Sequence, residues 1–262
     1  MPSATSTAHS VRDNTAFRAA ARGGFAVNGL LHILIGGIAL GVAFGGGGGN
    51  ADQGGALQTL AGNPLGAAVL WIVVIGLWAL GIFQLITAFL AGNDWKDKLK
   101  EGGKGIAYLA VGFTAFTFAR GGSTDSAQQT ESLSATLLKT PGGVILLVVL
   151  GLVVAAIGVY FIIKGAKKKF LDDITLPPGS VGNATTKLGM AGYIAKGIAI
   201  VVVGLLFLVA AFTSDATKAS GLDGALKSLV ELPFGVIVLA AVAIGLIAFG
   251  VYSFVRARYA KL

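Results

Sequence analysis

The chain repeats one pattern of glycines and prolines three times. Each copy begins with two glycines seven residues apart and reaches a proline 35 or 36 residues after the first of them. Another glycine stands seventeen residues after each proline. Repetition at fixed spacing is typical of a fold built from copies of one unit, so we expect three similar parts. The positions are Gly29, Gly36, Pro64 and Gly81, then Gly105, Gly112, Pro141 and Gly158, and finally Gly197, Gly204, Pro233 and Gly250.

The composition indicates that much of the chain lies in lipid. Of 262 residues, 55% are hydrophobic and 12% are charged, about half the charged fraction of soluble domains. Two short uncharged runs begin directly after a lysine, whose side chain can reach the headgroups. Four others are long enough to cross a hydrocarbon core as helices, so we predict six transmembrane helices. The long runs are 24–44, 65–90, 142–163 and 233–255, and the short ones are 105–119 and 197–214.

The basic residues are distributed unevenly over the predicted loops. Sixteen of the twenty Lys and Arg residues lie before the first helix or after an even-numbered helix. Basic residues are retained in the cytoplasm, so we predict a multi-pass protein of the bacterial inner membrane with both termini cytoplasmic. The net charge of +8 then belongs to a membrane surface, and we expect no nucleic-acid partner.

Each copy predicts the same succession of elements. A long helix leads to an outer loop with a short amphipathic helix, and a proline then precedes a second long helix. Two crossings per copy make the repeats parallel, so we expect an all-α integral membrane protein with pseudo-threefold symmetry. We expect a cytoplasmic loop over residues 171–186, which contain Pro177 and Pro178. The expected parts are a disordered cytoplasmic tail at residues 1–17 and repeats at residues 18–93, 98–174 and 186–262.

The glycines seven residues apart lie on one helix face. A glycine lets the backbone of another helix approach closely, so we expect these faces to be helix contacts. The alternative is that they act as hinges or expose backbone groups to an ion.

The third repeat carries the fullest version of the pattern. Its residues resemble those of the actinobacterial membrane proteins grouped as domain of unknown function 1206, and the resemblance covers about residues 18–262. It implies three two-helix modules and no activity. The first repeat departs from the pattern with Asn28 in place of lysine and Phe83 in place of tyrosine. The matching residues are Tyr193, Lys196, Gly197 and Gly204, followed by Ala225, Leu226, Leu229, Pro233, Gly235, Gly250 and Tyr252.

Few residues suit catalysis or metal binding. The chain has no cysteine and two histidines, His9 in the tail and His32 inside the first predicted span. No carboxylate falls within the predicted membrane core. A proton relay, a pair of catalytic aspartates and a serine triad each need a carboxylate there, so the sequence disfavours all three. We therefore expect neither an enzyme nor a bound cofactor or metal.

One polar position precedes the first glycine of each repeat. Symmetry places Asn28, Lys104 and Lys196 at one depth near the cytoplasmic face, around the axis or around the lipid-facing rim. Facing inward, they would form a ligand-binding layer for an anion or a lipid headgroup, with His32 and Tyr108 one turn deeper. Facing outward, the lysines would reach the headgroups. For His32, the alternative is a neutral imidazole bonded to a neighbouring helix.

The densest basic cluster ends the fourth predicted helix. Anionic lipid headgroups are attracted by about 1 kcal/mol per basic residue there, so we expect the cluster to contact them. We expect membrane lipids as partners, and in addition a protein partner or a second copy. The function hypothesis is a structural or interaction component without its own chemistry, and the alternative is a small channel or transporter for an anion or small solute. The cluster consists of Lys164, Lys167, Lys168 and Lys169.

Overall fold

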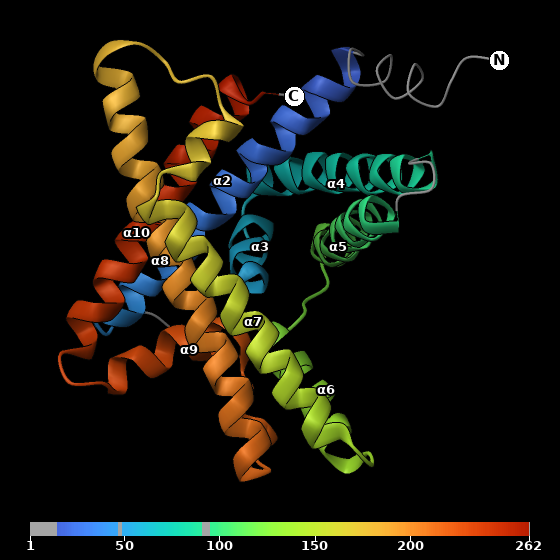
Figure 1. Ribbon diagram of the computed structural model, residues 1–262, viewed down its shortest axis with the longest axis vertical. Helices are drawn as coiled ribbons and strands as arrows, with labels where there is room; N and C mark the ends of the chain where they lie inside the picture. The colour runs from blue at the N-terminus through green and yellow to red at the C-terminus, as the bar shows by residue number, and fades with distance from the viewer. Residues whose placement is uncertain (1–14, 47–48, 91–94, 262) are drawn as a thin grey trace. The chain divides into compact units, whose positions relative to one another are not determined.

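The computed structural model describes residues 15–46, 49–90 and 95–261, and their regular elements are all helices (Figure 1). Four of these helices are long and apolar enough to cross a membrane. The all-α prediction is confirmed. The four are α2 (Thr15–Ala43, apolar from Arg22), α7 (Gly143–Ala166), α8 (Gly179–Thr213) and α10 (Gly235–Tyr259).

Two further long helices carry shorter apolar stretches. Helix α4 (Pro64–Leu90) has 27 residues and is apolar over Pro64–Trp78, and α5 (Trp95–Ala119) has 25 residues and is apolar over Gly105–Ala119. Both coincide with predicted spans. Lysines and other polar residues in the first half of α5 explain its shorter apolar part.

A short helix follows the first long helix of each repeat, as the sequence predicts. These are α3 (Gln53–Ala61), α6 (Ser126–Lys139) and α9 (Gly221–Ser228). Pro64 is the first residue of α4, whereas Pro141 and Pro233 stand two residues before α7 and α10. The missing N–H of proline costs nothing at such a position.

The loop prediction for residues 171–186 is wrong over its second half. A 3₁₀ turn, η1 (Lys169–Asp173), follows α7, and α8 begins at Gly179, directly after Pro178. Gly182 and Thr185 in the added turns are buried, and just beyond them a side chain at Gly189 would collide with Phe170. Packing against η1 therefore favours helix where the prolines alone predicted a loop.

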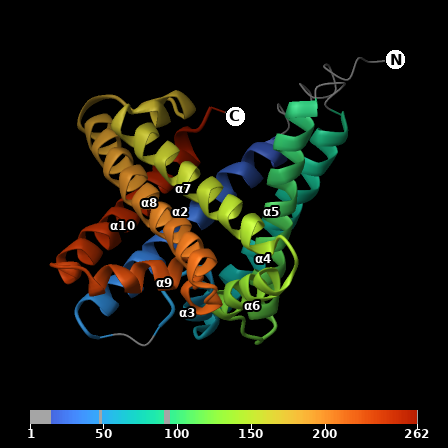
Figure 2. The same ribbon diagram turned by 60° about the horizontal axis from the view of Figure 1, so that its bottom comes forward.

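The chain forms two compact units. Of the described residues, the first unit contains those up to Asn28, 57–90, 95–124 and 256–261, and the second contains 29–46, 49–56 and 125–255. Helix α4 runs beside α5 in the first unit, and α7 beside α8 in the second (Figures 1 and 2).

The repeat glycines meet glycines on the neighbouring helix. In the second unit, a Cβ on Gly197 of α8 would lie 2.6 Å from the carbonyl oxygen of Gly158 on α7. A Cβ on Gly29 of α2 would lie 2.7 Å from the carbonyl oxygen of Gly250 on α10. In the first unit, a Cβ on Gly105 of α5 would lie 3.0 Å from the carbonyl oxygen of Gly81 on α4. The predicted helix-contact role of these glycines is confirmed.

Each pair joins two different repeats. The first long helix of a repeat packs on the last helix of the preceding repeat, and α2 of the first repeat packs on α10 of the third. The paired helices are antiparallel. Seven residues after Gly197, Gly204 meets Gly151, which stands seven residues before Gly158; likewise Gly36 meets Ala243, seven residues before Gly250. The unit of the sequence repeat is therefore not the unit of packing.

We expect Gly197→Ala to lower the free energy of unfolding by about 1–3 kcal/mol, because the new methyl would strike backbone atoms of Gly158 and Ile162. The measurement is thermal unfolding of the purified protein in detergent. Gly37→Ala on α2 is the matched control, since a Cβ there would meet nothing within 4 Å. Equal stability of the two variants would contradict the packing role.

Candidate functional site

An aromatic cluster joins η1, α8 and α10 in the second unit. It consists of Phe170, Ile174, Tyr193, Phe249 and Tyr252, all buried. The ring of Phe170 stacks on Tyr193, with centroids 5.3 Å apart and an angle of 13° between the planes. The Tyr252 hydroxyl donates a hydrogen bond to the carbonyl oxygen of Phe170 at 3.2 Å. This cluster anchors the turn that follows α7.

Two of the five residues of the predicted ligand-binding layer contact this cluster. The Lys196 ammonium lies 4.4 Å from the ring centroid of Phe249 on α10 and 5.3 Å from that of Phe161 on α7. The imidazole of His32 on α2 packs on the same Phe249, with centroids 4.7 Å apart. Lys196 therefore faces neighbouring helices, and cation–π attraction of about 1–2 kcal/mol per contact compensates part of its desolvation.

The other three members of the predicted layer belong to the first unit. Asn28 and Tyr108 are half-buried residues of the first unit. The side chain of Lys104 lies outside the described residues. The structure therefore brings together Lys196 and His32 of the five residues, and the layer as a whole stays a prediction.

The basic cluster divides into one tethered lysine and three exposed ones. Lys164 forms an ion pair with Asp173 of η1, with Nζ 2.7 Å from Oδ2, and its ammonium also lies 5.5 Å from the centroid of Tyr193. Lys167, Lys168 and Lys169 are exposed. Lys164 therefore helps to hold η1 in place, while the next three lysines offer their charge to the surroundings.

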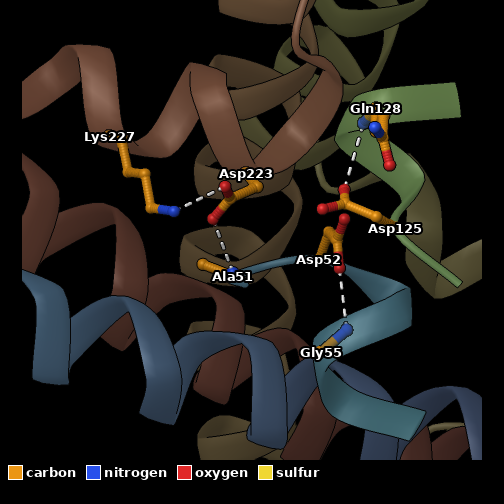
Figure 3. A network of polar contacts seen from close by, with 7 residues as sticks. All are labelled: Ala51, Asp52, Gly55, Asp125, Gln128, Asp223 and Lys227. Carbon is orange, nitrogen blue, oxygen red and sulfur yellow. Dashed lines mark hydrogen bonds and ion pairs between the residues drawn. The ribbon is translucent and has the colours of Figure 1, made fainter. Parts of the chain in front are cut away.

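A second polar site, which we call the aspartate junction, lies where α3, α6 and α9 begin (Figure 3). Asp52 accepts a hydrogen bond from the backbone N–H of Gly55 at 2.8 Å, and Asp125 accepts one from the backbone N–H of Gln128 at 3.0 Å. Asp223 accepts the Ala51 amide at 2.8 Å and pairs with the Lys227 ammonium at 2.7 Å. The Ala51–Asp223 bond joins the first repeat to the third. Asp52 and Asp223 are 4% and 5% exposed.

The surroundings of Asp52 oppose its ionisation. Burial raises the pKa of this carboxyl above its ordinary value, and the neighbouring Asp223 and Asp125 raise it further. Hydrogen bonds from the Gly55 amide and Ser126 act in the opposite direction. At Asp215, which caps the 3₁₀ turn η2 (Ala216–Lys218), hydrogen bonds from Thr217 lower the pKa instead.

The sequence did not reveal this junction. Asp52, Asp125 and Asp223 stand 12, 16 and 10 residues before the proline of their repeat, so alignment on the prolines separates them. Their common signal is a place at the start of a short helix, where a carboxylate accepts free backbone N–H groups. Among the described residues, no group of three or more His, Cys, Asp or Glu side chains is arranged to hold a metal ion.

We expect Phe170→Ala to lower the free energy of unfolding by about 3–5 kcal/mol, because it empties the centre of the aromatic cluster. Phe212→Ala is the control: its side chain is 77% exposed, and we expect a change within about 0.5 kcal/mol. Thermal unfolding in detergent measures both. A small effect at Phe170 would show that η1 is not held by this contact.

Comparison with known proteins matches the repeat to one family. The family model described as Domain of Unknown Function (DUF1206) matches three segments of the chain, residues 23–91, 101–168 and 191–260. The uncharacterised protein YxxB of Bacillus subtilis (strain 168) is 29% identical over 246 residues, which cover 90% of this chain and 88% of that protein. No solved structure matches the chain. Since this relative comes from Bacillus, the actinobacterial source stays a prediction.

Proposed function

Because the chain belongs to the DUF1206 family and holds three copies of its unit, we propose that it crosses the bacterial inner membrane six times. The four membrane-length apolar helices support this topology, and so do the lengths of α4 and α5. The basic residues favour cytoplasmic termini. Three units of two helices then follow one another around a pseudo-threefold axis.

The proposed role is a structural or interaction component of the membrane without catalytic activity of its own. The observation that carries it is the position of Lys196, whose ammonium lies over rings from two neighbouring helices. An ionisable residue within a membrane span is by default a candidate for transport. Here its charge serves contact between helices, and His32 packs on the same ring.

The partner proposed at the cytoplasmic face is anionic lipid. Lys167, Lys168 and Lys169 are exposed directly after α7, where headgroups lie in the proposed topology. Lys164 is paired with Asp173, so we assign it to the protein's own structure. A protein partner or a second copy is the further partner expected of such a component.

The alternative, a channel or transporter for an anion or small solute, requires Lys196 to face a water-filled path. Flux of chloride and phosphate through the purified protein in liposomes tests it. Flux that Lys196→Gln abolishes would overturn the structural role, whereas absence of flux together with a stably copurifying partner would support it.

The topology predicts which single cysteines a membrane-impermeant thiol reagent reaches in intact cells. The natural chain has no cysteine, so each variant carries one reactive thiol. We expect labelling of Ser132→Cys in α6, and labelling of Ser180→Cys in α8 only after the cells are permeabilised; both side chains are exposed. The reverse pattern would contradict the orientation.

We expect replacement of Lys167, Lys168 and Lys169 by alanine to weaken phosphatidylglycerol binding about 100-fold, since each lysine contributes about 1 kcal/mol. The measurement is lipid retention by the purified protein in native mass spectrometry, with phosphatidylcholine as the neutral reference. The matched control is Lys139→Ala with Lys218→Ala, which removes exposed charges on the opposite predicted side. Equal losses in both variants would show that general charge, not this cluster, binds the lipid.

A further inference from the structure

The aspartate junction places one carboxylate from each repeat at the start of a short helix. The three helices α3, α6 and α9 belong to different repeats, and their first turns meet in the second unit (Figure 3). The bond from the Ala51 amide to Asp223 spans 172 residues of sequence. The junction is therefore a contact between repeats and not local capping alone.

The charges of the junction are not balanced. The groups acting on Asp52 are the carboxylates of Asp223 on α9 and Asp125 on α6, together with the Ser126 side chain and the Gly55 amide. Among the residues that the structure describes, the ammonium bonded to these carboxylates is that of Lys227, which pairs with Asp223. Asp52 is buried, and its burial together with the like charges of the buried Asp223 and the exposed Asp125 makes its ionisation costly.

We propose that the aspartate junction is a pH-sensitive contact between the repeats, which tightens when Asp52 takes up a proton and loosens when Asp52 ionises. Protonation removes the repulsion from Asp223 and Asp125, and the neutral carboxyl gains an O–H that can donate to a carboxylate oxygen. The Asp52 acceptor for the Gly55 amide is retained in both states. The response is thus a change in one contact and does not require the chain to unfold.

The direction of this pH response follows from the linkage between proton binding and stability. The pKa of Asp52 lies above the ordinary value of 3.8. The stability that protonated Asp52 contributes is fully present below that ordinary value and is lost as the pH rises through the raised pKa. In the proposed topology the junction lies on the outer side of the membrane, so the contact responds to external pH.

The test is hydrogen exchange of the full purified chain in detergent, followed at residues 50–56 and corrected for intrinsic exchange. We expect the protection of this segment to fall more than twofold as the pH rises from about 3.5 to about 8, through the raised pKa of Asp52. Amides of α7 between Gly151 and Gly158 are the internal reference, because no titratable group lies in that stretch. Protection that is independent of pH would overturn the proposal.

Two variants separate Asp52 from other sources of pH dependence. Asp52→Asn keeps an acceptor for the Gly55 amide but cannot ionise, so its protection should change less than about twofold over the same range. Asp125→Asn removes one repelling carboxylate and should shift the wild-type response to lower pH. This second variant decides the matter if the first does not fold. A pH profile unchanged in both variants would assign the response to another group.

The result of the hydrogen-exchange experiment does not depend on the proposed role in the membrane. The exchange measurement needs neither lipid binding nor flux, and a negative result would not affect the proposal that the basic cluster binds anionic lipid. Conversely, a negative result in the lipid-binding experiment would not affect the proposed pH response of the aspartate junction.

Discussion

Direct backbone contact between glycines of antiparallel helices is the interaction on which the described fold depends. At Gly29, Gly105 and Gly197, a Cβ would lie within 3.0 Å of a carbonyl oxygen on the facing helix. Lipid tails are as apolar as leucine side chains, so burial of apolar surface drives helix association weakly in a membrane. Close packing supplies the attraction instead, and any side chain at these positions would reduce it.

The partner choice of these glycines interlocks the repeats. Each contact joins the end of one repeat to the start of the next, and the pairing of Gly29 with Gly250 joins the first repeat to the last. No repeat packs its own two long helices through these positions. A duplicated two-helix unit therefore depends on its neighbouring copies, as in other repeat proteins in which each unit stacks on the next.

The second unit has two polar sites. In the first, the aromatic cluster contacts the Lys196 ammonium, and the Lys164–Asp173 ion pair fixes η1. In the second, the aspartate junction joins the short helices of all three repeats. Both sites use charge to fix contacts between segments far apart in the sequence. The first rests on cation–π and ion-pair attraction, and the second retains repulsion that a proton can remove.

The sequence by itself determined the three repeats, the long and short helices, and the helix face on which each glycine lies, because spacing and hydropathy are local properties. It did not determine that Gly197 meets Gly158, or that Lys196 lies over Phe161 and Phe249, since periodicity marks a face and not its partner. Helix α8 begins at Gly179 within the predicted loop, and further along it Gly189 packs against Phe170. The aspartate junction also arose only in three dimensions, because Asp52, Asp125 and Asp223 occupy unequal positions in their repeats and meet only where the three short helices begin.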